Sequence, residues 1–269
     1  MLEIRLRPAR GHISLIWLSC LAAALLAVQI PEPAAAQDEG HDSGVQRAIS
    51  FSGFDFAKDS SSYYSGGILA LNKDLSRDGF VLRLMTSSGD FEYEQLAVPG
   101  GNVDGDEVSV DAMIGYQATI GLITATAYAG YEYRDIELSP NDPENTIRGT
   151  ESGFKIAFEA ETSDEIPLFA AVDADYSTAF EAWNAMLRLG YNMGRLVLGA
   201  EGSVSGVENE ESQRLGGFIT YRFNLTPSMP AELTADVGHQ FVDNEDAGEG
   251  NTTSGGEGTY AGAGLSFSF

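Results

Sequence analysis

The feature of this sequence that most constrains its fold is a two-residue alternation of apolar and polar side chains in segments of about ten residues. Segment 183–193 shows it most clearly, because Trp183, Leu187, Leu189 and Tyr191 alternate with polar or small residues. The same pattern recurs in three further segments: 154–161, 214–223 and 261–269. Successive side chains of a strand point to opposite faces, so the pattern predicts strands with one apolar and one polar face.

The number and length of these segments favour a membrane barrel. No apolar run after Val28 reaches the roughly 20 residues that a membrane helix needs. The sequence therefore predicts an all-β protein, a single antiparallel transmembrane β-barrel of about 12 strands (range roughly 10 to 14). The predicted strands are 47–57, 63–72, 79–94, 106–119, 122–137, 149–162, 167–179, 182–192, 195–206, 212–224, 231–242 and 257–269.

The connections between the predicted strands support this topology, because such barrels have short periplasmic turns and longer external loops. The connections expected on the periplasmic side are 73–78, 120–121, 163–166, 193–194 and 225–230. The longer external connections are 95–105, 138–148 and 243–256, whereas those near 180–181 and 207–211 are short. An even number of strands places both ends of the barrel on the periplasmic side. The third strand changes parity between Leu84 and Phe91, which predicts a β-bulge near Ser88 and Gly89.

A soluble β-sandwich is the structural alternative, because its strands also alternate. Two features favour the barrel. Tyr and Phe recur near the strand ends, where an interfacial girdle needs them, and the chain ends on Phe269 within a strand. We interpret Phe269 as an assembly signal that the barrel-assembly machinery reads.

The N-terminal residues have the layout of a secretory signal peptide. Arg5, Arg7 and Arg10 precede an apolar run over 13–28, and small residues at 34–36 form a cleavage site. We expect a signal peptide over 1–36, a periplasmic N-terminal segment over 37–46 and an outer-membrane β-barrel over 47–269, so the expected location is the bacterial cell outer membrane. Cys20 raises a lipoprotein alternative, but its place inside the apolar run favours an ordinary signal residue.

Charge excludes one class of partner. The whole chain carries a net charge of −25, and removing residues 1–36, with three Arg and two Glu, would leave −26. Phosphates would be repelled, so we expect no nucleic-acid partner. The predicted mature chain has no cysteine, and disulfides therefore do not stabilise it.

Four charged residues of inward parity are expected to lie beside one another on neighbouring strands. Hairpin turns at 180–181 and 207–208 place Asp173 opposite Arg188, and Glu201 opposite Arg214, while a turn at 193–194 leaves Glu201 diagonal to Arg188. The predicted lumenal charge ladder consists of Asp173, Arg188, Glu201 and Arg214, with Asp175 at its margin; Arg222 opposite Glu232 or Asp236 would extend it.

Two interpretations of the ladder remain open. A polar lining is the default for a barrel lumen, and a plug or selectivity element is the alternative. Eight strands enclose little space and 16 to 18 leave an aqueous channel, so about 12 strands are intermediate.

The sequence offers little support for an enzyme. His239 could form part of a Ser-His pair on the lipid face, but Ser254 and Asn251 lie on a Gly-rich stretch without a third orienting group. We favour an interfacial role for His239. The acidic stretch 243–257 could bind a divalent cation weakly, yet it lacks the spacing of a calcium loop and is better explained as a solvated loop. We therefore predict no catalytic, cofactor-binding or metal-binding residues.

Three segments carry a resemblance to a known family. They are FSGFDFAKDSSSYYSGGILALNKDLSRDGFVLRLMTSSGDFEYE (51–94), IGYQATIGLITATAYAGYEYRD (114–135) and LVLGAEGSVSGVENEESQRLGGFITYRF (196–223). They resemble the bacterial cellulose biosynthesis protein BcsS family, with Gly199, Glu201, Gly206, Arg214 and Gly216 in a familiar order. The resemblance implies an accessory outer-membrane protein of cellulose or related exopolysaccharide production in alphaproteobacteria, and it implies no catalytic residues.

Three functions follow as hypotheses. The first is a non-enzymatic barrel that supports biosynthesis, secretion or surface anchoring of cellulose or another exopolysaccharide. The second is a small-solute channel, and the third is a lipid-modifying barrel enzyme. The expected partners are outer-membrane lipid, the barrel-assembly machinery, and the exopolysaccharide with its synthase or export complex; no cofactor is expected.

Overall fold

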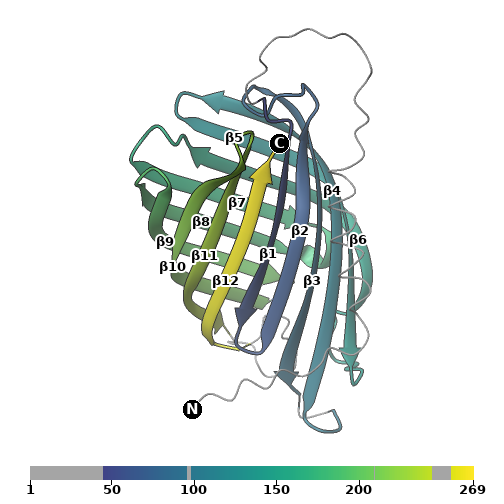
Figure 1. Ribbon diagram of the computed structural model, residues 1–269. Coiled ribbons are helices and arrows are strands. Elements are labelled where there is room, and N and C mark those ends of the chain that lie inside the picture. Colours follow the sequence, from purple (N-terminus) through teal and green to yellow (C-terminus); the bar gives the residue numbers. More distant parts are fainter. Residues whose placement is uncertain (1–44, 96–97, 209, 244–255) are drawn as a thin grey trace. The chain divides into compact units, whose positions relative to one another are not determined.

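The computed structural model describes residues 45–95, 98–208, 210–243 and 256–269, which form a closed antiparallel β-barrel (Figure 1). Each strand pairs with its neighbours in sequence, and β12 closes the ring by pairing with β1. The strands are β1 (Ala48–Ala57), β2 (Ser60–Ala70), β3 (Gly79–Glu94), β4 (Asn102–Ile120), β5 (Ile123–Ser139), β6 (Gly149–Thr162), β7 (Leu168–Ser177), β8 (Trp183–Asn192), β9 (Leu196–Val207), β10 (Glu210–Thr226), β11 (Met229–Asp243) and β12 (Gly258–Ser268). The predicted fold class and the strand number of about 12 are confirmed.

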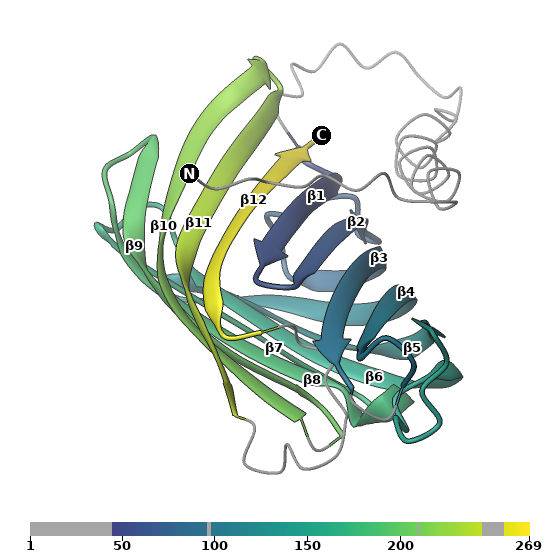
Figure 2. The ribbon, with the colours of Figure 1, turned by 90° about the horizontal axis from the view of Figure 1, so that it is seen from below.

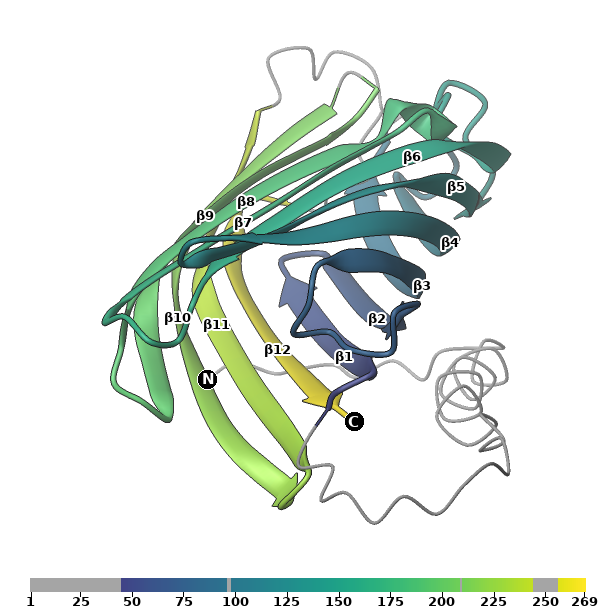
Figure 3. The same cartoon turned by 90° about the horizontal axis from the view of Figure 1, so that it is seen from above.

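The two ends of the barrel differ in their connections. β12 ends where β1 begins, at the top of Figure 1, and the short turns that the sequence analysis predicted as periplasmic lie at this end. Two of these turns contain only two or three residues and have glycine at positive φ, at Gly121 (φ 65°) and Gly194 (φ 82°). Such backbone geometry suits tight hairpins, whose twist matches that of the flanking strands. Figures 2 and 3 show the ring of strands from its two ends.

The exterior of the barrel is apolar. Outward residues include Phe80 on β3, which is 54% exposed, and Phe154 on β6, which is 73% exposed. Further outward apolar residues lie on the other strands, among them Ile114, Leu187, Leu189, Leu215, Ile219 and Leu233. A continuous apolar surface of this kind is unfavourable in water, where each Å² costs about 25 cal/mol, and it matches the hydrocarbon layer of a bilayer. The chain is therefore a barrel of the bacterial outer membrane, and the soluble sandwich alternative is wrong.

The predicted bulge in the third strand is also wrong. β3 keeps one register along its whole length, from Gly79 opposite Gln117 to Glu94 opposite Asn102 on β4. The parity change arises because Phe91 points into the barrel, where apolar residues pack at this end, rather than outward to lipid. The register shift that does occur lies on β10, between Asn224 and Thr226 beside the turn to β11.

The N-terminal predictions fall largely outside the described residues. The signal peptide over 1–36 and the segment 37–46, of which only residues 45–46 are described, stay predictions. Among the described residues, no helix is long and apolar enough to cross a membrane.

Candidate functional site

The interior of the barrel is the candidate site, and its external end is partly filled by an apolar cluster. Phe91 and Tyr93 on β3 pack with Val103, Ile136 and Phe180. Val98 and Ile147, from the loops after β3 and β5, belong to the same cluster. The Tyr93 hydroxyl donates a hydrogen bond to Asp142 (2.9 Å) and accepts one from the Asn145 amide (3.0 Å). These bonds connect the loop between β5 and β6 to β3.

Charged residues fill the middle of the interior beside this cluster. The Lys155 ammonium on β6 lies 3.1 Å from Asp111 on β4, 3.0 Å from Glu132 on β5 and 3.5 Å from Asp175 on β7. We call these four residues the central charge cluster. Lys155, Asp111 and Glu132 are buried, with side chains at most 5% exposed. Charges this far from water are stable only when they are paired.

A second cation, Arg83 on β3, joins this cluster to more distant strands. Its Nη1 lies 2.6 Å from Glu159 on β6, and its Nε lies 3.8 Å from Asp111. The guanidinium also lies 4.8 Å above the ring of Tyr128, within the range of a cation–π contact. Because β4 and β5 separate β3 from β6, the Arg83–Glu159 pair crosses part of the lumen.

The predicted ladder residues are only partly brought together. Arg188 and Glu201 lie directly opposite each other on β8 and β9, and their side chains are 2.9 Å apart. The predicted pairing of Asp173 with Arg188 is wrong, because Asp173 lies opposite Met186. The predicted pairing of Glu201 with Arg214 is wrong as well, because Arg214 lies opposite Ser203. In the β8–β9 hairpin, Glu201 lies opposite Arg188 rather than diagonal to it as predicted. In all three hairpins the observed register differs by two residues from the predicted one, since the turns are centred one residue away from the assumed positions.

Arg214 instead bridges β10 and β1. Its Nη1 is 3.0 Å from both carboxylate oxygens of Asp55, and its Nε donates to the Gln240 side chain at 2.7 Å. Tyr260 on β12 connects Arg214 to the Arg188–Glu201 pair. The Arg214 guanidinium lies 4.9 Å above the Tyr260 ring, and the Tyr260 hydroxyl donates to Glu201 at 2.8 Å.

The two residues placed at the margins of the ladder have other partners. Asp175 belongs to the central charge cluster through Lys155. Arg222 lies opposite Glu232, at 2.7 Å, and also reaches Asp164 (2.6 Å) and Glu161 (3.8 Å) across the positions of β7 to β9. Asp236, the other partner considered for Arg222, lies opposite Phe218 instead. This group lies at the periplasmic end, so ion pairs between non-adjacent strands occur at three levels of the interior.

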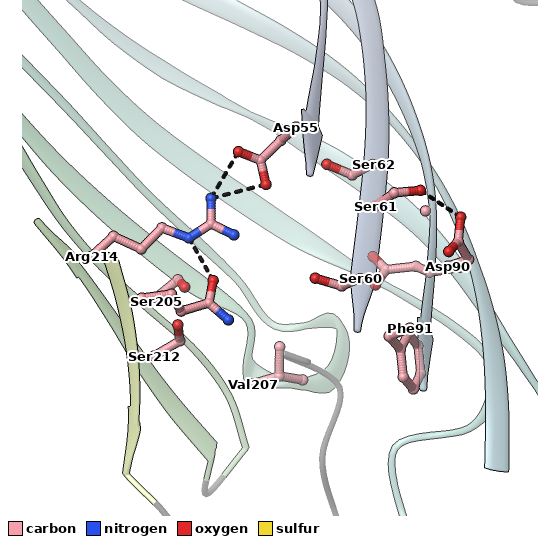
Figure 4. A pocket seen from close by; sticks show the side chains of 13 residues that line it. Asp55, Ser60, Ser61, Ser62, Asp90, Phe91, Ser205, Val207, Ser212 and Arg214 are labelled. Carbon is pink, nitrogen blue, oxygen red and sulfur yellow. Dashed lines mark hydrogen bonds and ion pairs between the residues drawn. The ribbon is translucent and has the colours of Figure 1, made fainter. Parts of the chain in front are cut away.

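An unfilled space remains beside the apolar cluster at the external end. This outer cavity has a volume of about 210 Å³ and lies between β1, β2 and β3 on one side and β9, β10 and β11 on the other (Figure 4). Its walls include Arg214 with its two hydrogen-bond acceptors Asp55 and Gln240, and the apolar residues Phe91 and Val207. Of these five residues, only Arg214 was predicted from the sequence as a residue of the interior.

The residues considered for other chemistry lie outside the lumen or outside the described residues. His239 lies on β11, where its side chain is 46% exposed, its ring packs on Phe241 (4.7 Å) and its Nε2 is 3.5 Å from Glu257. Ser254 and Asn251 lie outside the described residues, as does most of the acidic stretch 243–257. Among the residues that are described, no three His, Cys, Asp or Glu side chains are grouped to hold a metal ion.

Comparison with known proteins identifies the family. The profile of the cellulose biosynthesis protein BcsS family matches residues 49–269, which is nearly the whole barrel. The chain belongs to the BcsS family. The resemblance drawn from segments 51–94, 114–135 and 196–223 is thus confirmed, and this BcsS protein is linked to cellulose biosynthesis through its family.

Solved structures that superimpose on this BcsS protein have low sequence identity to it. KdgM porin has 10% identity and a TM-score of 0.43, over 82% of this chain and 99% of that one. The transport unit of the autotransporter AIDA-I from Escherichia coli has 9% identity and a TM-score of 0.45, over 93% and 98%. The COG4313 outer membrane channel from Pseudomonas putida F1 has 12% identity and a TM-score of 0.43, over 87% and 100%. Among curated proteins, none matches the sequence of this chain.

Proposed function

We propose that this BcsS protein is a non-enzymatic accessory barrel that anchors cellulose or a related exopolysaccharide at the cell surface, and that the polymer does not pass through its lumen. Family membership supports the link to cellulose. The location supports contact with a secreted polymer, because the external ends of the strands face the cell exterior.

Paired charges that bridge the lumen are the observation that supports a polymer path outside the barrel. Arg83–Glu159, Arg214–Asp55 and Arg222–Asp164 each join strands or turns that are not adjacent in the barrel. A sugar chain in the lumen would have to displace all three pairs. The Arg83–Glu159 pair, with its arginine 8% exposed, is the most costly to break, and the Arg222–Asp164 pair, with its aspartate 62% exposed, is the least costly. The apolar cluster of the two external loops adds a further obstruction.

The anchoring role that we propose requires no chemical reaction at the barrel. His239 lies on the outer surface beside Phe241 and Glu257, a position that suits an interfacial residue. A lipid-modifying enzyme would need a nucleophile within hydrogen-bonding reach of such a histidine. If the protein is an anchor, His239→Ala should leave its function intact.

Deletion of the gene tests the proposal in the organism. We expect less cellulose attached to the cell surface, with restoration by the wild-type gene and by His239→Ala. Unchanged polymer yield and attachment in the deletion strain would refute the anchoring role. Restoration by the wild type but not by His239→Ala would instead support the enzyme hypothesis.

A further inference from the structure

We propose that the outer cavity binds one neutral sugar ring, the terminal unit of a β-glucan chain. This inference rests on the proposed anchoring function and names the place where the polymer would be held. It follows from the shape, the hydrogen-bonding groups and the charge of the cavity, each of which limits the class of ligand.

The cavity presents planar polar groups on one side. Asp55, Arg214 and Gln240 form a hydrogen-bonded row, in which Arg214 Nε and Nη1 are engaged (Figure 4). Arg214 has five N–H donors, and its remaining nitrogen Nη2 points toward the β2 wall. Vicinal hydroxyls of a sugar are spaced to bond with two atoms of such planar groups, and bonds to charged groups are the stronger kind.

Small hydroxyls line the two facing walls. Ser60 and Ser62 come from β2, and Ser205 and Ser212 come from β9 and β10. Among the residues that the structure describes, none of these four hydroxyls forms a hydrogen bond with another side chain or with the backbone. A hydroxyl can both donate and accept, which is the property that matches it to another hydroxyl-rich molecule.

The cavity also offers an apolar surface. Phe91 from β3 and Val207 from β9 belong to its lining. Sugar rings carry polar hydroxyls around their edge and C–H groups on their faces, so a site that combines hydroxyls, planar polar groups and apolar side chains matches both parts. A purely charged or purely apolar ligand would leave one set of these groups without a partner.

Charge and volume narrow the class further. The lining contains three carboxylates, Asp55, Asp90 and Glu107, and one cation, Arg214. Arg214 pairs with Asp55, and Glu107 pairs with Arg134 outside the lining at 3.4 Å. An acidic sugar would therefore be repelled, which favours a neutral one. The volume of about 210 Å³ lies below the roughly 300–1,000 Å³ of sites for drug-sized ligands, which leaves room for one ring and not for a folded chain.

Binding can be measured with the full-length protein by isothermal titration calorimetry in lipid nanodiscs or in an amine-oxide detergent. Maltoside and glucoside detergents must be avoided, because their headgroups are themselves neutral sugars. The probes are cellotetraose as the neutral glucan and an oligogalacturonate of equal length as the acidic one. We expect saturable binding of cellotetraose and none of the oligogalacturonate.

Two neighbouring serines provide a matched pair of variants. Ser62→Leu places bulk in the cavity and should abolish binding. Ser61→Leu makes the same change one residue away. Ser61 also borders the cavity, but it lies opposite the outward-facing Phe56 and its hydroxyl donates to Asp90 at 2.6 Å, so this variant should bind as the wild type does. Arg214→Lys keeps the charge beside Asp55 but loses the planar fork, and should weaken binding about tenfold. A heat-induced mobility shift on a gel verifies that each variant is folded.

Failure of this inference can be separated from failure of the proposed function. Absence of cellotetraose binding, or equal binding by Ser62→Leu and Ser61→Leu, would overturn the sugar site. If the deletion strain still loses attached cellulose in that case, the anchoring role stands and a different surface holds the polymer. Tighter binding of the oligogalacturonate would also overturn the inference, since it would assign the cavity to acidic sugars.

Discussion

The substitution Lys155→Met tests whether the paired charges of the interior stabilise the barrel. Lys155 is the shared partner of Asp111, Glu132 and Asp175, and its replacement leaves buried carboxylates without their main counter-ion. Breaking a buried ion pair by removing one partner costs about 3–5 kcal/mol. We expect the free energy of unfolding to fall by about 3 kcal/mol, the lower end of this range. Two cations remain near the carboxylates, because Arg83 lies 3.8 Å from Asp111 and Arg134 lies 3.4 Å from Glu132.

The loss can be measured from urea unfolding of the detergent- or vesicle-inserted barrel, followed by tryptophan fluorescence. Lys73→Met is the matched control, since Lys73 lies exposed in the turn between β2 and β3 and should change the free energy of unfolding by less than about 0.5 kcal/mol. Adding Asp111→Asn and Glu132→Gln to Lys155→Met should recover part of the loss, because the excess negative charge is then removed. A loss below about 1 kcal/mol for Lys155→Met would refute the reasoning.

Three further predictions concern the ends of the barrel. Phe269→Ser should lower the amount of folded, heat-modifiable barrel in outer-membrane fractions, and an unchanged amount would contradict its role as an assembly signal. Arg222→Ala should change the free energy of unfolding by only about 1 kcal/mol or less, because its partners are half-exposed; a loss above about 2 kcal/mol would contradict that reasoning. In the turn between β2 and β3, hydrogen bonds from the hydroxyl and the backbone N–H of Ser76 lower the pKa of Asp74, helped by Arg77. Its contribution to stability is therefore present above the ordinary pKa of an aspartate and is lost as the pH falls through the lowered one. The amide protection factors in this turn, which are intrinsic exchange rates divided by the observed rates at each pH, should therefore fall at acid pH, and Asp74→Asn should abolish that dependence.

The fold could be predicted from the sequence because barrel strands are encoded locally. The predicted strands 79–94 and 149–162 have the observed bounds of β3 and β6, since alternation and turn residues mark each strand separately. The error at Phe91 has a physical cause. Alternation distinguishes apolar from polar residues, and it identifies the lipid side only where the interior is polar, which is not so beside the apolar cluster.

The interior could be predicted only between neighbouring strands. Arg188 and Glu201, and likewise Arg222 and Glu232, lie within single hairpins, so parity and approximate turn positions bring them close together. The Arg214–Asp55 contact joins residues 159 positions apart, and it depends on how the ring closes. The tilt and stagger of the closed ring determine which residues meet across the lumen, and no local pattern carries that information.

Arg83, Asp111, Glu132 and Lys155 were missed for a different reason. All four have inward parity, which the sequence shows, but they are spread over the four strands β3 to β6 rather than lying within one hairpin. Listing the charged residues of inward parity on every strand would have found them. Their mutual distances still require the structure, because Arg83 and Glu159 lie on strands that do not pair.

The most direct test of the account is the single-channel conductance of the purified full-length protein in planar bilayers. A lumen bridged by ion pairs at three levels and partly filled by an apolar cluster predicts no steady open pore. A stable, reproducible open conductance would contradict that description of the interior, and it would favour a small-solute channel over an anchor.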